Sequence, residues 1–336
     1  MRVLVVGGTG FIGPHVVRRL VDGGHEVVVF HRGRTGADLP EGARRFEGDR
    51  RRLEEHSDGL RRLAPEVVLD MIPMNERDAR ETIAVFRGVA GRVVAVSSED
   101  VYRAYDIVRG LHPGPPDPVP LDEEAPLRER LYPYERPEAE EYEKILVERA
   151  VMGDPHMPGT VLRLPMVYGP GDGMHRLFPY LKRMDDGRPA VLLDEGMARW
   201  RWTRGYVEDV AAAIALAVAD ERATGRVYNV GEADAPTEAR WVEEIGRAAG
   251  WDGRVLGLPK DALPPHLARE YEGSNFEQHL VVDTGRIRRE LGYEESVPRG
   301  EAIRRTVGWE REHPPNEVDL AEFDYAAEDD ALAKLE

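Results

Sequence analysis

The feature that most constrains the fold is the segment GGTGFIG at residues 7–13. It follows the β-branched run RVLVV at 2–6 and leads into residues 11–22, whose apolar side chains recur at helical spacing. Glycines between a strand and a helix allow a tight turn and let the backbone approach a pyrophosphate at the helix N-terminus. The pattern therefore predicts a βαβ unit that binds a dinucleotide. The residues expected to line this turn are Gly7, Gly10, Phe11, Ile12 and Gly13.

Further apolar runs recur along the first half of the chain, separated by helix-like stretches. They are EVVVF at 26–30, VVLDMI at 67–72, RVVAVSS at 92–98 and a run that begins at 160. Continuous apolar runs of this length are typical of parallel strands that are buried on both faces. The sequence therefore predicts an α/β fold with an open, doubly wound parallel sheet.

Residues 103–137 interrupt this rhythm with many prolines, which regular elements do not tolerate. Two interpretations stay open for this segment: a lid over a site, or a surface insertion. A helix is expected from about Pro137, because proline suits the first helical turn. The acids Glu140 and Glu141 would then lie where the helix dipole favours negative charge.

Composition excludes several kinds of site. The chain of 336 residues has no cysteine, which excludes disulfides, thiolate metal sites and cysteine nucleophiles, and its ten histidines lack metal-ligand spacing. A formal net charge of -17 argues against a nucleic-acid partner. No apolar run approaches the roughly 20 residues of a membrane span. With no leader-like N-terminus, a cytoplasmic protein is expected.

The end of the second strand bears on the choice of cofactor. An acid is expected there if the ribose 2′-hydroxyl of NAD is bound. His31 occupies that place, and Arg32 and Arg34 follow it. Guanidinium groups suit a 2′-phosphate, so NADP is favoured over NAD. Asp49, in a later turn, would either meet the adenine or act as a turn or cap residue.

Several motifs occur in the order found in the extended short-chain dehydrogenases/reductases, the NAD-dependent epimerases and dehydratases of nucleotide sugars. After the glycine turn they are AVSSEDVY, KILVE, LRLPMVYGPGD, GYVEDVA and VVDTGRIRRELGY. The chain resembles this family over roughly residues 1–310. The resemblance implies a Rossmann domain, a smaller α/β C-terminal substrate domain and a site between them. The expected division is 1–170 plus about 203–230 for the first domain, about 171–202 and 231–312 for the second, and 313–336 as a loosely held acidic tail.

The resemblance also implies a relay of Ser/Thr, Tyr and Lys. Ser98 matches the first and Lys144 the last, but the tyrosine position, four residues before the lysine, holds Glu140. Tyr142 is two residues from Lys144, and on a regular helix such positions face nearly opposite sides. Three alternatives stay open. Glu140 is the acid/base; the helix is distorted or begins late, so that Tyr142 reaches the site; or the relay is lost and Glu140 forms a plain ion pair with Lys144.

Other expected site residues lie around this relay. Met71 and Ile72, at the end of the preceding strand, would narrow the cofactor channel, and Pro165 and Val167 match the family's strand that closes over the nicotinamide. The side chains expected to contact a polar substrate are Tyr102, Tyr168, Arg204 and Asn275.

Two functions are compatible with these features. The first is an NADP(H)- or NAD(H)-dependent epimerase, dehydratase or reductase acting on a sugar or nucleotide sugar. The second is a dinucleotide-binding protein without turnover, such as a redox sensor, a scaffold or a relative of the chloroplast stem-loop RNA-binding proteins, which GYVEDVA and HRGR also resemble. Ser98 and Lys144 favour the first, and the missing tyrosine favours the second. By family analogy, a homodimer would form through residues 138–152.

Overall fold

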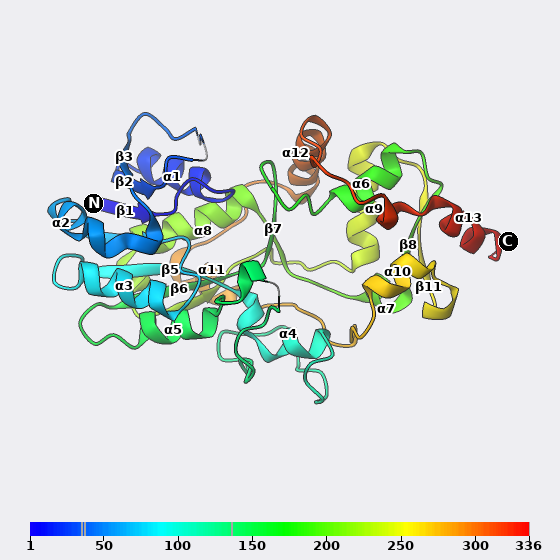
Figure 1. The fold of residues 1–336 in the computed structure, drawn as a ribbon, viewed down its shortest axis with the longest axis horizontal. Coiled ribbons are helices and arrows are strands. Elements are labelled where there is room, and N and C mark those ends of the chain that lie inside the picture. The colour runs from blue at the N-terminus through cyan, green and yellow to red at the C-terminus, as the bar shows by residue number, and fades with distance from the viewer. Residues whose placement is uncertain (35, 37, 136, 336) are drawn as a thin grey trace.

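The largest part of the computed structural model, which describes residues 1–34, 36, 38–135 and 137–335, is a seven-stranded parallel sheet (Figure 1). The strand order is β10-β6-β5-β4-β1-β2-β3, and every neighbouring pair is parallel. Its strands are β1 (Arg2–Val6), β2 (Glu26–His31), β3 (Ala43–Glu47), β4 (Val67–Asp70), β5 (Arg92–Ser98), β6 (Gly159–Leu164) and β10 (Val227–Asn229). The order reverses between β1 and β4, so the predicted doubly wound sheet is confirmed.

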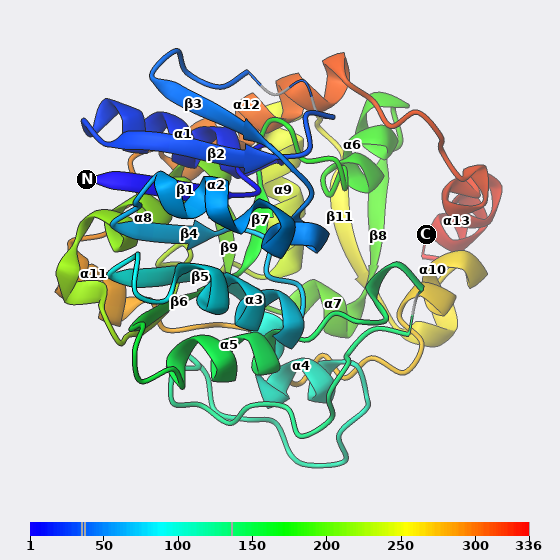
Figure 2. The same cartoon turned by 60° about the vertical axis from the view of Figure 1, so that its left-hand side comes forward.

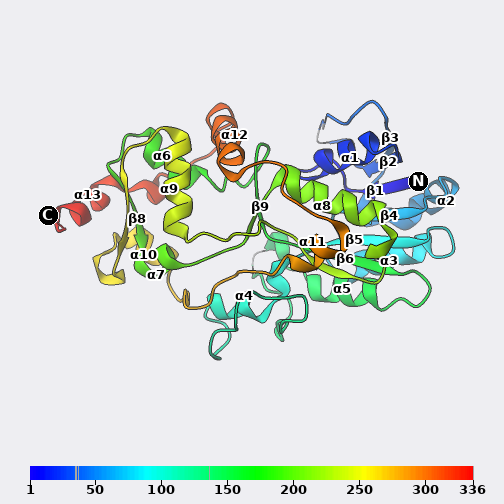
Figure 3. The ribbon, with the colours of Figure 1, turned by 180° about the vertical axis from the view of Figure 1, so that it is seen from behind.

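Helices cover both faces of the sheet, as Figure 2 shows. On one face, α1 (Gly13–Asp22) packs against α8 (Val207–Ala219); on the other, α3 (Glu76–Phe86) packs against α5 (Lys144–Met152). Each face has its own apolar cluster, with side chains such as Val17 and Ile214 on the first. Figure 3 shows α8 from behind, next to α11 (Gly285–Leu291). The apolar runs become strands because both of their faces are buried.

A smaller α/β body contains the two-stranded parallel sheet of β8 (Ala190–Asp194) and β11 (Arg254–Leu258), at the right of Figure 1. Between the two bodies lies a second parallel pair, β7 (Met166–Tyr168) and β9 (Arg204–Tyr206). The remaining helices are α2 (Ser57–Arg62), α4 (Arg103–Val108), α6 (Phe178–Asp185), α7 (Glu195–Arg199), α9 (Glu238–Ala249), α10 (Pro265–Glu270), α12 (Arg299–Glu312) and α13 (Tyr325–Ala333). The predicted smaller α/β part of the chain is therefore present.

The expected helix from Pro137 is wrong. Residues Pro137–Ala139 form a single 3₁₀ turn, and α5 begins only at Lys144. The cause is Glu143, whose carboxylate accepts a hydrogen bond from the Ile145 amide at 2.8 Å and so caps the helix. The fully buried guanidinium of Arg128 lies 3.2 Å from the same carboxylate. This anchor fixes the helix start two residues after Tyr142.

The proline-rich segment is better ordered than its composition suggests. It opens with helix α4 and then crosses between the two bodies, forming isolated bridges from Leu121 to Val282 and from Tyr102 to Leu127. The buried side-chain oxygen of Gln278, from the second half of the chain, accepts a hydrogen bond from the Asp117 amide at 2.5 Å. The segment is therefore tied to the second half of the chain at Asp117 and at Leu121.

The C-terminal segment is docked, and the expectation of a loosely held tail is wrong. The Glu328 side chain in α13 is only 1% exposed, and its carboxylate lies 2.8 Å from the Arg183 guanidinium of α6. His266 of α10 approaches the same carboxylate at 3.3 Å. A high density of acids suggests solvation, but part of the negative charge of this segment neutralises basic groups on the smaller body.

Replacing Glu328 by glutamine is expected to release this segment from the smaller body. The substitution leaves the buried Arg183 without its counter-charge, which costs about 3 kcal/mol. Amide hydrogen exchange over residues 320–333 should accelerate far more than exchange in the parallel sheet. Asp330→Asn removes an exposed charge from the same helix and should leave both rates unchanged. Equal acceleration in the two variants would contradict the anchoring role of Glu328.

Candidate active site

The glycine turn after β1 has the form that the sequence predicts. Gly7 has a φ of +88°, which favours glycine, and a Cβ on Gly13 would lie 2.4 Å from the carbonyl carbon of Gly8. Around Gly10 the space is open, with nothing within 4 Å of where a Cβ would stand. Helix α1 begins without a capping side chain and without an acid in its first turn. These features leave its N-terminal amides suited to an anion.

The end of β2 forms the next part of the site. His31 is buried; its Nδ1 accepts a hydrogen bond from the Gly33 amide at 3.1 Å, and its Nε2 has no partner within the described chain. Arg32 and Arg34 line a pocket together with Glu47, Gly48, Asp49, Arg51 and Arg52. Neither Arg32 nor Arg34 forms an ion pair with any described residue. The unpartnered imidazole nitrogen and the unpaired guanidinium groups fit the ribose and phosphate of a dinucleotide.

Asp49, Met71 and Ile72 lie around this part of the site. The Asp49 carboxylate caps a 3₁₀ helix by accepting from the Arg51 amide at 3.0 Å, and this hydrogen bond lowers the pKa of Asp49. Met71 is buried, whereas Ile72 is 38% exposed. The Ile72 side chain lies 2.5 Å from where a Cβ on Gly7 would stand. The Ile72 side chain therefore packs against Gly7 and leaves no room for a side chain at position 7.

The end of β5 gathers polar groups from three segments. Ser98 is the last residue of the strand, and its hydroxyl accepts from the Asp100 amide at 3.3 Å. The Tyr142 hydroxyl donates to Asp100 Oδ2 at 2.8 Å, and the Ser98 side chain is one of the groups that act on the pKa of this phenol. Tyr134, from the proline-rich segment, donates to the same carboxylate oxygen at 2.9 Å. The structure therefore brings Ser98 and Tyr142 together.

Lys144 is buried close to Tyr142 and Asp100. Its Nζ donates to the backbone oxygens of Pro73 at 2.8 Å and Val96 at 3.0 Å, and it lies 5.6 Å from the centroid of the Tyr142 ring. Burial lowers the pKa of Lys144 to about 8, and the nearby Asp100 charge opposes this shift. An ammonium has three donors, so one N–H remains after the two backbone contacts.

The late start of α5 decides the geometry of the relay region. Tyr142 precedes the helix, so the helical rule that separates positions two apart does not apply to it. Glu140 lies in an exposed turn and shares a surface pocket with Asn75, Arg77 and Glu141. The Lys144 ammonium donates instead to the buried backbone oxygens of Pro73 and Val96, and it forms no ion pair with Glu140. Of the features named in the three alternatives, the structure has the late helix start, with Tyr142 in contact with Asp100, and it lacks the Glu140–Lys144 pair.

The four residues expected to contact a substrate are held by other parts of the protein. Tyr102 and Tyr168 are completely buried, with hydroxyls bonded to Asn229 at 2.6 Å and Glu232 at 2.8 Å. Arg204 is 2% exposed, pairs with Glu238 and lies 4.4 Å from the Trp241 ring centroid. Asn275 accepts from the Glu277 amide at 3.2 Å within its own loop. Their polarity suggested ligand contacts, but the partners that these side chains have are internal.

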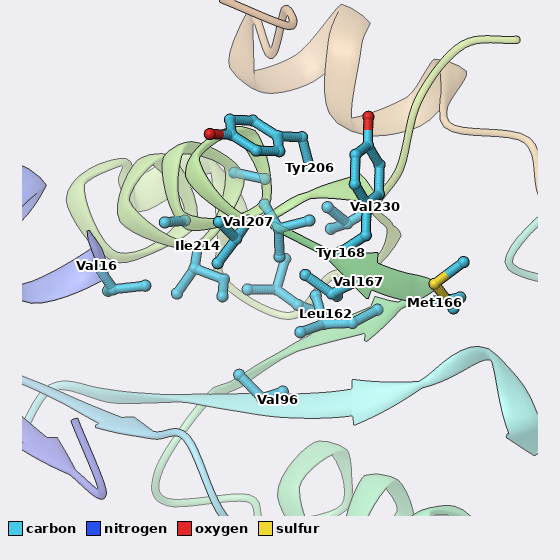
Figure 4. Close-up of a cluster of buried hydrophobic side chains, with 14 of the residues drawn as sticks. Val16, Val96, Leu162, Met166, Val167, Tyr168, Tyr206, Val207, Ile214 and Val230 are labelled. Atoms are coloured by element: carbon cyan, nitrogen blue, oxygen red, sulfur yellow. The ribbon is translucent and has the colours of Figure 1, made fainter. Parts of the chain in front are cut away.

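Pro165 and Val167 are buried as well. Figure 4 shows Val167 in the apolar cluster beneath β7, with Tyr168 and Tyr206 extending away from the neighbouring strands β7 and β9. The rings of the two tyrosines lie 5.7 Å apart. Pro165 and Val167 therefore pack around the strand pair that lies between the two bodies.

An acidic pair that follows Ser98 was not among the predicted site residues. Asp100 is 3% exposed and Glu99 is 4% exposed. Burial raises the pKa of both carboxyls, most strongly that of Glu99, which accepts a hydrogen bond from the Trp202 indole. The available signal was two acids placed directly after a buried strand, at the edge of the sheet where ligands bind.

Two further features are absent from the described residues. None of the helices is both long enough and apolar enough to cross a membrane. Nowhere in the described chain do three or more histidine, aspartate or glutamate side chains gather as a metal ion would require.

Comparison with known proteins gives consistent matches. The model of the NAD dependent epimerase/dehydratase family matches residues 3–231. The 2′-dehydrokanamycin reductase of Streptomyces kanamyceticus is 30% identical over 299 residues, which are 86% of this chain and 78% of that protein. The 3-diazoavenalumate denitrifying reductase of a Streptomyces species is 27% identical over 325 residues, 94% and 97% of the two chains. Among solved structures, UDP-glucose 4-epimerase of Thermus thermophilus in complex with NAD superposes with a TM-score of 0.65 at 25% identity, over 93% of this chain and 100% of that one.

Proposed function

Because the chain belongs to the NAD dependent epimerase/dehydratase family, we propose that it is an NADP(H)-dependent reductase that interconverts a carbonyl and a hydroxyl on a sugar-like substrate. The observation that carries this proposal is the pair of arginines at the end of β2 that form no ion pair with a described residue, at the same edge of the sheet as the group of Ser98, Tyr142 and Lys144. A cofactor with a 2′-phosphate is typical of enzymes that release it after each turnover, which suits a reductase better than an epimerase.

The glycine turn and the amides of α1 would hold the pyrophosphate, and Arg32, Arg34 and His31 would hold the phosphorylated ribose. When it is bound, the nicotinamide supplies the hydride chemistry. The protein's own part is to hold the substrate oxygen and to move a proton to or from it. We assign the holding of this oxygen to Ser98 and Tyr142, which both contact Asp100: the Ser98 hydroxyl accepts from the Asp100 amide, and the Tyr142 hydroxyl donates to the Asp100 carboxylate.

The sugar class of the substrate rests on the relatives. One has a name that specifies the reduction of a dehydrokanamycin, and the structurally similar epimerase is named for UDP-glucose. We therefore propose a polyhydroxylated substrate with one carbonyl. The test is turnover of 2′-dehydrokanamycin with NADPH, and of UDP-glucose with NAD, by the purified protein. Oxidation of NADPH to NADP⁺ that depends on the added keto sugar supports the proposal. Tight cofactor binding without turnover of a wider set of keto sugars would favour a binding protein.

Replacing Arg32 and Arg34 by alanine should weaken NADPH binding by about 10- to 100-fold, because two charge-assisted contacts to the 2′-phosphate are lost. NADH binding should change less than about 2-fold, since NADH lacks that phosphate. Quenching of tryptophan fluorescence gives both dissociation constants. Arg18→Ala removes an exposed charge from the nearby helix α1 and should leave both constants unchanged. Equal weakening of NADPH and NADH would contradict the assignment of these arginines.

A further inference from the structure

Asp100 lies at the centre of a chain of hydrogen bonds that connects the two sides of the site. Tyr142 and Tyr134 both donate to its Oδ2, at 2.8 and 2.9 Å. The Tyr105 hydroxyl of α4 donates in turn to the Tyr134 hydroxyl at 3.2 Å. Three phenols and one carboxyl therefore form a continuous path from the Ser98 side of the site to α4.

The rings along this path are fixed in place by their neighbours. The rings of Tyr134 and Tyr142 pack edge to face at 5.2 Å, and those of Tyr105 and Tyr134 at 6.3 Å. The Arg109 guanidinium lies 5.5 Å from the Tyr105 ring and 5.8 Å from the Tyr134 ring, and it donates to the Pro133 carbonyl. Such contacts keep the three hydroxyls within hydrogen-bonding distance of their partners, as proton transfer along a hydrogen-bonded path requires.

The charged groups that face Asp100 come from three segments. Lys144 of α5 and Arg128 of the proline-rich segment favour its ionised form, and the adjacent Glu99 opposes it. Arg128 also donates to the Asp100 backbone oxygen. The second carboxylate oxygen, Oδ1, is buried and has no hydrogen-bond partner among the described residues. The carboxyl is therefore only partly stabilised as an anion, which suits a group that gains and loses a proton.

Tyr142 by itself is a poor base in this environment. Burial and the neighbouring Asp100 charge raise its pKa well above the ordinary value. If the phenol lost its proton to solvent, two negative oxygens would face each other at 2.8 Å in a buried site. This repulsion disappears if the phenol's proton moves to Asp100, because the pair then keeps a single negative charge.

We propose that Asp100 stores the mobile proton of this site and exchanges it with the substrate oxygen through Tyr142. When a hydroxyl is oxidised, its O–H bond breaks, its proton binds the Tyr142 oxygen, and the Tyr142 proton moves to Asp100 Oδ2. When a carbonyl is reduced, each of these bonds forms and breaks in the opposite sense. The hydride that leaves or enters the same carbon is the cofactor's part of the reaction. Tyr134 and Tyr105 then pass the stored proton from Asp100 to water at the α4 end, where Tyr105 is only partly buried, and take one up from water in the opposite direction. This inference rests on the proposed function, and Asp100 acts in it as a positioning residue behind Tyr142.

The first test measures the pH dependence of turnover in both directions, with a reducible keto sugar such as 2′-dehydrokanamycin and with its alcohol. Oxidation needs ionised Asp100, so its rate should fall as the pH drops through the pKa of this carboxyl. Reduction needs the protonated form, so its rate should fall as the pH rises through the same pKa. Asp100→Asn should remove both dependences and lower kcat about 100-fold. A variant that keeps the wild-type pH profiles would overturn the inference.

The second test compares two tyrosines of the same segment. Tyr134→Phe should slow turnover about 10-fold and reduce the solvent deuterium isotope effect, with KM unchanged. Tyr132→Phe is the matched control, because Tyr132 is 48% exposed and no described residue is hydrogen-bonded to its hydroxyl. Identical behaviour of the two variants would contradict the path through Tyr134.

The third test needs no substrate, so it separates this inference from the proposed function. In protein with ¹³C-labelled aspartate, the Asp100 carboxyl is identified by its loss in Asp100→Asn and is titrated by NMR. A phenol that donates to the ionised form lowers the pKa, so Tyr134→Phe and Tyr142→Phe should each raise it. An unchanged titration would overturn the inference even if the protein is an active reductase. A raised pKa in a protein that turns over no keto sugar would leave the proton store supported and would contradict only the proposed function.

Discussion

Replacing Tyr142 by phenylalanine is expected to lower kcat for hydride transfer by about 10³-fold, the usual range for loss of a positioned proton donor. Its hydroxyl donates to Asp100, which also donates its amide to Ser98, so in the proposed mechanism it is the phenol that connects the substrate oxygen with the buried acid. Cofactor affinity should remain within about 2-fold of wild type, because the glycine turn and the end of β2 are unchanged. Single-turnover rates with NADPH measure the first quantity, and fluorescence titration measures the second.

The matched control for Tyr142 is Glu140→Gln. By spacing along the chain, Glu140 occupies the place of the family's tyrosine, yet it is exposed in a turn. We expect this variant to keep wild-type kcat. A large loss in Glu140→Gln together with a small loss in Tyr142→Phe would reverse the assignment and would require the turn at residues 140–143 to rearrange when substrate binds.

The largest expected effect on stability comes from Arg163, in β6. Its guanidinium makes a two-point contact with the Glu148 carboxylate, at 3.0 and 2.8 Å, and both side chains are buried. Arg163→Met leaves Glu148 as a buried charge without its partner, and among the described side chains only the Ser97 hydroxyl then donates to it, at 2.6 Å. The free energy of unfolding should fall by about 3–5 kcal/mol. Urea-induced unfolding, followed by circular dichroism, gives this difference.

Two further variants show whether burial is the cause. Arg240→Met breaks a pair with Glu244 in which the guanidinium side chain is 67% exposed, and it should cost less than about 1 kcal/mol. The double variant Arg163→Met, Glu148→Leu removes both buried charges and should recover most of the loss. If the double variant is as unstable as the single one, the cost comes from the other contacts of Arg163, to the Tyr102 hydroxyl and the Glu123 carbonyl, and not from an unpaired carboxylate.

The sequence predicted those strands that form because of their own residues. The apolar runs at 2–6, 26–30 and 92–98 became strands, because short β-branched runs of this kind are buried on both faces in a parallel sheet. Strand β3 was missed because its residues, ARRFE, form the exposed edge of the sheet and carry no apolar run. A strand at an edge is defined by its pairing with β2, and pairing is not visible in a single segment.

The candidate site could be predicted only in part, for a related reason. Ser98 and Lys144 were predicted as site residues because each matches a position in a short motif. The position of Tyr142 depends on where α5 begins, and that depends on Glu143 being held by Arg128, fifteen residues earlier in a segment without regular structure. The polar residues expected at the substrate, such as Arg204, have internal partners in the structure, and polarity alone does not distinguish a ligand contact from a buried internal pair.

The start of α5 at Lys144 has a consequence for how relatives of this chain are recognised. Where a tyrosine and a lysine share one helix, their spacing along the chain is fixed by the helical repeat, and a search for that spacing finds them. In this chain the tyrosine lies in the segment before the helix, so the distance between the two side chains in space does not determine the number of residues between them. Insertions or deletions near residue 140 can then accumulate without loss of the phenol. Surveys that classify such chains as inactive from a fixed motif will discard members whose tyrosine has moved along the sequence and not away from the site.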